Sequence, residues 1–346
     1  MPASKKPPVF EHLFSWRYDE EGTRSPRWDE TTNTIPDDRR IVFSDEVVTA
    51  IRELKVTLGN NQAANFTKDF LRKSSRSLNW PASLAARRWT MKQKTGKEPG
   101  TNRARNFVFK PYDLGSDDPF PDDWPTPKSL ADHAIQSVTI SVASKQLERL
   151  DETRLMQIVV DLRIVETHFA LYSPLSTDDF KVVHMDHLQM GLKLRGSEID
   201  GLYLAEFMDA SRDLHPVLIT VEAKKHDEFI NTTQLISQVI AASGLGIQCE
   251  KIVAIALKHI DGGVVLFEFA PFTPPPAIKM SEDALVDEDL LDVSTVRYSV
   301  VPPMIGLSQR AKRPRTVSAK AVEQSNFIEP EVDESLLADD DGEDDE

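Results

Sequence analysis

Cysteine is almost absent from this chain, which has 346 residues and a single thiol at Cys249. One cysteine excludes a disulfide framework and the zinc sites built from cysteine pairs, and it is typical of a reducing compartment. Long apolar runs are also missing, so the sequence predicts no membrane span. The segment Met1 to Lys6 leads into no apolar stretch, so we expect no signal peptide and a cytoplasmic location.

Two common catalytic motifs are absent as well. No Gly-x-x-x-x-Gly-Lys-Ser/Thr phosphate loop occurs, which argues against ATP hydrolysis, and the Gly-x-Ser-x-Gly motif of many serine hydrolases is missing. The segment His184-Met185-Asp186-His187 suggests zinc as an alternative, but its spacing is poor for metal ligands on one strand. Cys249 is predicted to pack in the core rather than to act as a nucleophile.

A carboxylate two residues before a lysine occurs three times, and one occurrence has a context in which both side chains can act together. The three triplets are Glu53-Leu54-Lys55, Asp179-Phe180-Lys181 and Glu222-Ala223-Lys224. The first lies in a predicted helix, where residues two apart point away from each other. The second follows a polar run, where a strand is predicted to begin. The third ends the apolar, β-branched run Val217 to Val221, which is typical of a buried strand.

Strand geometry divides this third segment between two faces. Side chains alternate along a strand, so the odd-numbered residues from Val217 to Ala223 form an apolar face, whereas Glu222 and Lys224 share the other face. The preceding segment Ser197 to Ala205 is also strand-like and carries Asp200, and a polar stretch of turn-forming residues joins the two. The sequence therefore predicts a hairpin that brings Asp200 beside the other two charged groups.

The segment after the hairpin is predicted to be a helix. Residues 228–242 are apolar at helical spacing, and Gln234 and Gln238 stand four apart within them. Residues four apart face the same direction on a helix, so the two amides are expected to point together toward nucleic-acid phosphates or toward the charged strand.

Further strands and a helix flank this unit. Residues 251–256 and 263–269 predict two strands joined by a tight turn. Upstream, Gln146 to Tyr172 predicts one long helix with a buried apolar stripe. The predicted order is therefore helix, strands, helix and strands.

With these segments in order, the sequence resembles the PD-(D/E)XK nuclease superfamily, and within it the type II restriction endonucleases. The resemblance covers residues 146–272 and is carried by the segments Glu198-Ile199-Asp200, Val221-Glu222-Ala223-Lys224 and Gln234-x-x-x-Gln238. It implies an α/β fold whose restriction-endonuclease-like core is a mixed β-sheet flanked by helices in the order α-β-β-β-α-β. The chain departs from the family pattern in having isoleucine rather than proline before Asp200.

The resemblance also implies roles for individual residues. Asp200 and Glu222 are the implied metal-binding carboxylates, and Lys224 is implied to position or polarise the attacking water. The accessory residues implied by the resemblance are Glu166, Glu198, Gln234 and Gln238. Glu198 shares a strand face with Asp200, so the choice between them as the metal ligand stays open, and Asp200 is favoured.

These roles imply an endonuclease that hydrolyses phosphodiester bonds of double-stranded DNA, with Mg²⁺ as cofactor and Mn²⁺ as a substitute. By the same resemblance we expect a homodimer, a companion DNA methyltransferase, and a prokaryotic cytoplasm with access to the nucleoid. The alternatives are a repair, junction-resolving or mobile-element nuclease of the same fold, and a catalytically inactive DNA-binding protein.

Charge along the chain is distributed unevenly. The net charge is −15, yet residues 68–110 hold twelve Lys and Arg against two acidic residues, a local charge of +10. Basic side chains near tryptophans such as Trp80 and Trp89 are typical of a DNA-contacting region. The candidate DNA-binding residues are Lys68, Arg72, Lys73, Arg76, Arg87, Arg88, Lys92, Lys94, Arg103 and Arg105.

Composition predicts several segments. We expect an N-terminal arm over residues 1–40, a basic, mainly helical DNA-recognition region over 41–135, and a nuclease core over 136–275. A linker is predicted for residues 276–330 and a disordered acidic tail for residues 331–346, which carry ten carboxylates.

Overall fold

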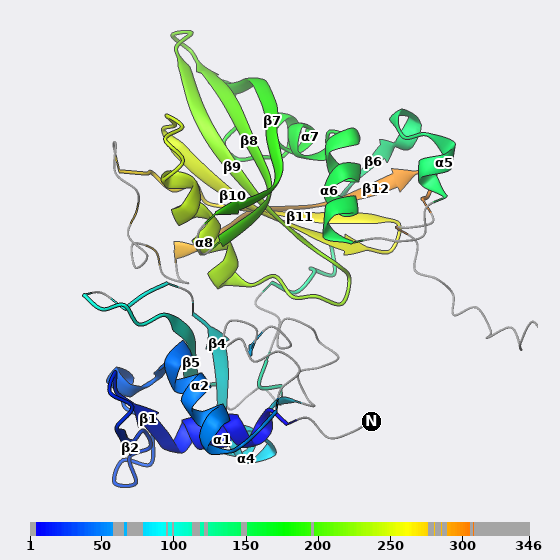
Figure 1. Cartoon of the computed structure of the whole chain (residues 1–346). Helices are drawn as coiled ribbons and strands as arrows, with labels where there is room; N and C mark the ends of the chain where they lie inside the picture. Colours follow the sequence, from blue (N-terminus) through cyan, green and yellow to red (C-terminus); the bar gives the residue numbers. More distant parts are fainter. Residues whose placement is uncertain are drawn as a thin grey trace, which may run out of the picture. The chain divides into compact units, whose positions relative to one another are not determined.

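The chain folds as a mixed α/β protein built around a seven-stranded sheet (Figure 1). The computed structural model describes residues 5–57, 66–67, 79–94, 96–98, 100–112, 118–120, 124–146, 151–194, 197–275, 280, 285, 289–304 and 307. The described elements form an N-terminal part up to residue 112 and a C-terminal part that contains the large sheet.

The C-terminal part alternates strands and helices. Its strands are β6 Ala131–Gln136, β7 Phe180–Leu194, β8 Ser197–Asp209, β9 Leu214–Lys224, β10 Lys251–Ile260, β11 Gly263–Phe269 and β12 Asp292–Val301. Its helices are the 3₁₀ turn η4 Ser137–Thr139, α5 Val142–Lys145, α6 Glu152–Asp161, α7 Ile164–Leu171 and α8 Thr232–Ser243.

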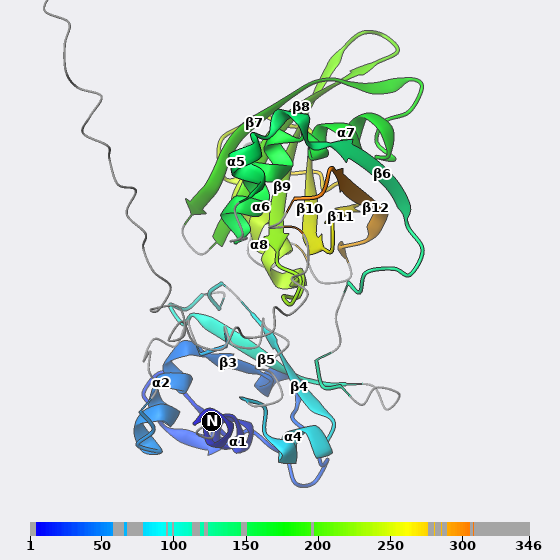
Figure 2. The same ribbon diagram turned by 90° about the vertical axis from the view of Figure 1, so that its right-hand side faces the viewer.

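The seven strands lie in the order β6-β12-β11-β10-β9-β8-β7 (Figure 2). The pairs β9–β10 and β6–β12 are parallel, and the other neighbours are antiparallel. The strands β7, β8 and β9 form a meander, as the predicted hairpin required, and the chain then crosses through α8 to reach β10. The sheet includes β6 and β12, so it extends past both ends of the predicted 136–275 core.

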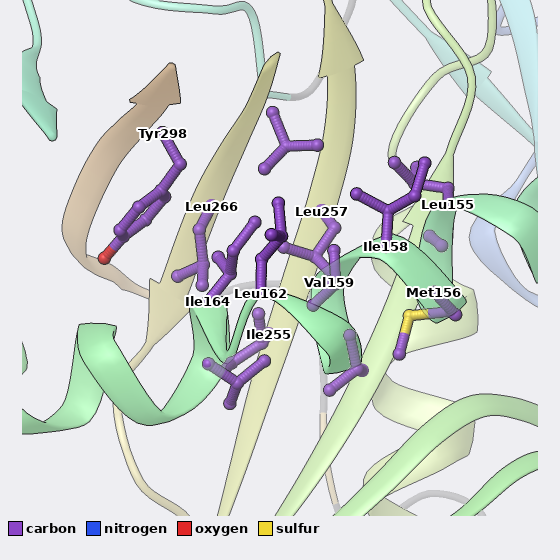
Figure 3. Packing of buried hydrophobic residues seen from close by; sticks show 14 of the residues in the cluster. Leu155, Met156, Ile158, Val159, Leu162, Ile164, Ile255, Leu257, Leu266 and Tyr298 are labelled. Atoms are coloured by element: carbon purple, nitrogen blue, oxygen red, sulfur yellow. The ribbon is translucent and has the colours of Figure 1, made fainter. Parts of the chain in front are cut away.

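Helices cover both faces of this sheet. The apolar sides of α6 and α7 pack on one face of the sheet. There they lie in one cluster with Ile255 and Leu257 of β10 and Leu266 of β11 (Figure 3). The apolar side of α8 packs on the other face. The alternation predicted for β9 is confirmed, because Val217, Ile219, Val221 and Ala223 all lie in the cluster beneath α6 and α7. Glu222 and Lys224 of β9 therefore point to the face of the sheet that α8 covers.

The single helix predicted over residues 146–172 is wrong. The chain forms two helices, α6 and α7, because Arg163 between them adopts a left-handed conformation with φ of 52°. The apolar stripe nevertheless continues across the break, since Leu155, Ile158 and Val165 are all buried. Similarly α8 begins at Thr232 rather than near residue 228, because the Asn231 side chain accepts a hydrogen bond from the Thr233 N–H and caps the helix.

The prediction of a mainly helical N-terminal region is also wrong. A three-stranded sheet, in the order β3-β5-β4, and the hairpin β1–β2 accompany short helices. The elements are α1 Pro7–Ser15, β1 Trp16–Tyr18, β2 Arg24–Pro26, the 3₁₀ turn η1 Asp37–Arg39, β3 Ile41–Phe43, α2 Ser44–Glu53, α4 Ala82–Ala86, β4 Trp89–Gln93 and β5 Arg105–Pro111. Alternating apolar residues in β5, such as Phe107 and Phe109, are fully buried, which explains a strand where charge alone had suggested helices.

Aromatic side chains form the core of the N-terminal part. Phe10 and Phe14 of α1 are buried against Trp80, Trp89 and neighbouring phenylalanines. Residues of the predicted N-terminal arm therefore contribute to this core. The two tryptophans are only 6% and 4% exposed, so they are not available to stack on DNA bases as the sequence suggested.

The remaining predictions concern segments outside these parts. The acidic tail over residues 331–346 lies outside the described residues. Within the described ranges, no helix is long and apolar enough to cross a membrane.

A buried ion pair joins three segments of the N-terminal part, and it makes a testable prediction. Glu46 accepts hydrogen bonds from the backbone N–H groups of Tyr18 and Phe43, and it lies 2.5 Å from the guanidinium of Arg27. Because Glu46→Ala leaves a buried guanidinium unpaired, we expect the free energy of unfolding to fall by about 3–5 kcal/mol in urea titrations. Asp37→Ala removes an exposed ion pair with Arg40 and should leave the midpoint unchanged. Equal effects of the two substitutions would contradict a stabilising role for the buried pair of Glu46 and Arg27.

Candidate catalytic site

Three charged side chains meet where the pairing of β8 with β9 ends. The last backbone pair of the two strands is Gly201 with Val221. One residue earlier on β8, the Oδ2 atom of Asp200 accepts a hydrogen bond of 2.8 Å from the backbone N–H of Ala223. A side-chain carboxylate thus replaces the carbonyl that would continue the ladder, and it is held between Glu222 and Lys224.

Glu222 is the centre of the group. It is 3% exposed, and its two carboxylate oxygens accept hydrogen bonds from different partners. The Nζ atom of Lys224 donates to Oε1, and the Nε2 atom of Gln238 donates to Oε2. The same amide of Gln238 also donates to the backbone carbonyl of Glu198, at 2.8 Å. Gln238 therefore connects α8 to both strands that carry the charged residues.

Burial and mutual charge shift the ionisation of this group. Burial, and then the charge of Glu222, raise the pKa of Asp200 to about 7. Burial by itself lowers the pKa of Lys224, but the charge of Glu222 and the hydrogen bond to it raise that pKa above its ordinary value. At neutral pH the site therefore holds a charged ammonium and a carboxyl, Asp200, that is close to half protonated.

The accessory residues predicted from the sequence lie in different surroundings. Glu198 has an exposed carboxylate that pairs with Lys193 at 3.6 Å, and its charge makes a small contribution to the raised pKa of Asp200. Gln234 lies one turn before Gln238 on α8, with its Oε1 atom buried. Glu166 lies on α7 next to Tyr203, under the opposite face of the sheet, so the structure does not bring it to the three charged residues.

A second charged group beside the first was missed by sequence reasoning. Glu152, at the start of α6, lies 2.9 Å from the Nζ atom of Lys225, and Glu228 lies 3.7 Å from the same ammonium. Burial and a hydrogen bond with Glu152 raise the pKa of Glu228. The residue that follows Lys224 therefore contacts a helical acid at Glu152 rather than at Glu166. The two adjacent lysines were the signal in the sequence for this second group. Lys224 bonds to Glu222, whereas Lys225 pairs with Glu152 of α6.

The candidate DNA-binding residues are only partly described. Lys68, Arg72, Lys73 and Arg76 lie outside the described residues. Arg87 is exposed, and Arg88, Lys92 and Lys94 are half-buried around α4 and β4. Arg105 is buried. Arg103 bonds to Asp45 at 2.9 Å and to the backbone carbonyl of Tyr18, so it serves the fold of the N-terminal part.

The donor set suits a hard divalent cation. Asp200 and Glu222 offer carboxylate oxygens, and Mg²⁺ is usually held by one or two carboxylates together with waters and substrate phosphates. Within the described ranges, no set of three or more His, Cys, Asp or Glu side chains is positioned to hold a metal ion. The Oε1 atom of Gln238 is buried beside Glu222 and has no hydrogen-bond donor, as expected where water or a hydrated cation belongs.

Comparison of the chain with protein-family models, with curated proteins and with solved structures found no match.

The raised pKa of Asp200 predicts how stability depends on pH in the absence of metal. Between its unfolded value of 3.8 and about 7, the folded protein retains a proton that the unfolded chain has lost. The free energy of unfolding should therefore fall as pH rises through this window. Asp200→Asn should flatten this decline in urea titrations at pH 4.5 and 7.5 with EDTA, whereas Asp186→Asn on the exposed edge strand should not. A decline that persists in Asp200→Asn would show that Asp200 is not the group with the raised pKa.

Proposed function

We propose that this protein is a Mg²⁺-dependent endonuclease that hydrolyses phosphodiester bonds in double-stranded DNA. The observation that carries the proposal is the convergence of Asp200, Glu222 and Lys224 at one end of two paired strands. Two carboxylates and an ammonium at one place are the minimal set for binding a divalent cation beside a phosphate and for orienting water.

The order of elements around these residues agrees with the PD-(D/E)XK resemblance. Helices α6 and α7 precede the meander β7-β8-β9, which is followed by α8 and by β10. The acidic residue lies on the second strand of this unit and the Glu-x-Lys segment on the third. We therefore propose a restriction-endonuclease-like core for the C-terminal part.

Each residue has a distinct task in the proposed reaction. The ammonium of Lys224 lies close to Glu222 and stays protonated, so it can attract the attacking oxygen and the negative charge that accumulates on the phosphoryl group. Gln238 fixes the orientation of Glu222. The backbone bond from Ala223 fixes Asp200. These bonds preorganise the site, so little rearrangement is needed when the substrate binds.

Asp200 and Glu222 are the residues that would hold the cation. Mg²⁺ bound there supplies positive charge to the phosphate oxygens and increases the acidity of water. Asp200 must lose its proton before it binds a cation, because its pKa in the metal-free protein is about 7. Its affinity for the cation is therefore linked to pH in the neutral range.

Recognition of the substrate belongs to the same proposal. We propose a sequence-specific enzyme of the type II restriction class that acts as a homodimer, since two-fold symmetry suits the cutting of both strands of a symmetric site. A companion methyltransferase would protect host DNA. Arg87, Arg88, Lys92 and Lys94 supply positive charge in the N-terminal part for contacts with DNA phosphates.

The first test is cleavage of a long DNA duplex with Mg²⁺. Lys224→Ala should lower the cleavage rate by about 100- to 1,000-fold, because it removes a charge that stabilises the transition state. Lys181→Ala provides a matched control, since Lys181 ends another carboxylate-x-Lys triplet but is exposed on β7. It should cleave like the parent protein. Binding of DNA in Ca²⁺, measured by gel shift, should be retained in both variants.

The products separate the possible outcomes. Discrete bands indicate a sequence-specific enzyme and a smear indicates a nonspecific one, whereas cutting restricted to branched DNA indicates a junction-resolving nuclease. Retarded but uncut DNA, or full activity in Lys224→Ala, would rule out the proposed catalytic role.

The second test uses Mg²⁺ and pH without any substrate. Protons compete with the cation for Asp200, so Mg²⁺ should raise the unfolding temperature more at pH 8 than at pH 6. Differential scanning calorimetry of the full chain measures this directly. Glu222→Gln should remove the Mg²⁺ effect at both pH values, and EDTA should reverse it in the parent protein. A Mg²⁺ effect that is the same at both pH values would contradict the role of Asp200.

A further inference from the structure

A cavity lies beside the candidate catalytic site, where the parallel strands β9 and β10 end. Its volume is about 320 Å³, and residues after β9 and at the end of β10 line it. The lining residues include Asp118, His226, Asp227, Glu228, Phe229, Lys258 and His259. Ligands of α/β proteins commonly bind at the carboxyl ends of parallel strands, and a cavity of this size is at the lower limit for small-molecule sites.

The register of the two strands connects this cavity to the catalytic residues. Lys258 of β10 pairs directly with Lys224 of β9. Lys258 is 8% exposed, and its ammonium lies 5.6 Å from the ring centroid of Phe229. Glu228, also buried, is close enough to Lys224 to influence its ionisation. A group bound in the cavity would therefore be a direct neighbour of the bond that the enzyme is proposed to cleave.

Three rings contribute to the walls of the cavity. Phe229 is 7% exposed, and the imidazoles of His226 and His259 lie with centroids 6.3 Å apart at 70°. His259 donates from Nε2 to the backbone carbonyl of Leu307 at 3.1 Å. In the neutral imidazole this bond leaves Nδ1 as an acceptor. Flat, weakly polar walls of this kind suit a planar heterocycle.

The charges of the lining residues favour a donor of N–H groups over a bare anion. Asp118 and Asp227 supply two carboxyl groups against the single ammonium of Lys258, whereas the carboxyl of Glu228 already pairs with Lys225. An isolated phosphate would meet more negative than positive charge there. Carboxylates accept hydrogen bonds from the exocyclic amino groups of bases, as they do from cytosine in the major groove.

We propose that this cavity binds one unstacked nucleobase of the DNA substrate, of the kind that carries an exocyclic amino group. This inference rests on the proposed function, because it places the base next to the scissile phosphodiester. Taking a base out of the duplex costs a few kcal/mol, and stacking on aromatic rings offsets about 1–3 kcal/mol per base. The enzyme would thus read one nucleotide outside the helix, in addition to any contacts made in the groove.

Binding of mononucleotides to the full chain in EDTA tests the inference without catalysis. Isothermal titration calorimetry should show deoxycytidine or deoxyadenosine monophosphate binding about tenfold more tightly than thymidine monophosphate, which lacks the amino group. The double substitution His226→Ala and Asp227→Ala removes exposed lining residues and should abolish this preference. The matched control replaces His184 and Asp186, an exposed, hydrogen-bonded pair on β7, by alanine and should leave the preference intact.

Each alternative outcome overturns the inference. Absence of nucleotide binding, equal binding of thymidine monophosphate, or equal binding of inorganic phosphate would exclude a base pocket, as would unchanged binding in the His226/Asp227 variant. The digest separates this failure from failure of the proposed function. DNA cleavage without mononucleotide binding would leave the endonuclease proposal intact, and mononucleotide binding without cleavage would leave the base pocket and remove the endonuclease.

Discussion

The hydrogen bond from the Ala223 N–H to Asp200 is the constraint on which the candidate site depends. Where β8 and β9 cease to pair, the backbone of β9 still needs an acceptor, because an unpaired buried N–H is costly. Asp200 supplies it with a side chain, at 2.8 Å. The requirement of the sheet thus determines where the carboxylate lies. Strand alternation then puts Glu222 and Lys224 on the same face, so that one local pairing rule assembles all three groups.

This assembly is electrostatically unfavourable unless a cation is present. Two carboxylates and one ammonium are confined near α8, and the pKa of Asp200 rises to about 7 because ionising a second carboxylate in a buried position is costly. Gln238 offsets this electrostatic cost only in part, because it donates to Glu222 but leaves its own Oε1 atom buried without a donor. A purely structural ion pair would be more stable with one carboxylate. The presence of the second acid therefore favours a binding role over a structural one.

Features set by alternation along one strand could be predicted from the sequence, whereas features set by packing between distant segments could not. The hairpin and the face of Glu222 follow from alternation along one strand, and both are as predicted. The break at Arg163 was not visible, because a left-handed residue is usually marked by glycine or asparagine and here is an arginine. The position of Glu152 depends on how α6 packs across the sheet, which no local pattern encodes. In the N-terminal part, Trp80 and Trp89 looked like DNA contacts, but aromatic residues in a basic segment are equally good core residues.

The topology also explains why the chemistry gathers at one end of the sheet. Within the described part of the chain, β9 and β10 are joined by a helical crossover through α8, so both strands end at the same edge. The residues that follow β9, including Glu228, turn back there toward the start of α8. Lys224 and Lys258 lie next to each other at this edge because the register is parallel. An antiparallel partner in place of β10 would bring the start of a strand to this edge, and the second lysine would lie about 20 Å away at the opposite end. The parallel pair is therefore what allows one edge to hold both the charged triad and the neighbouring cavity.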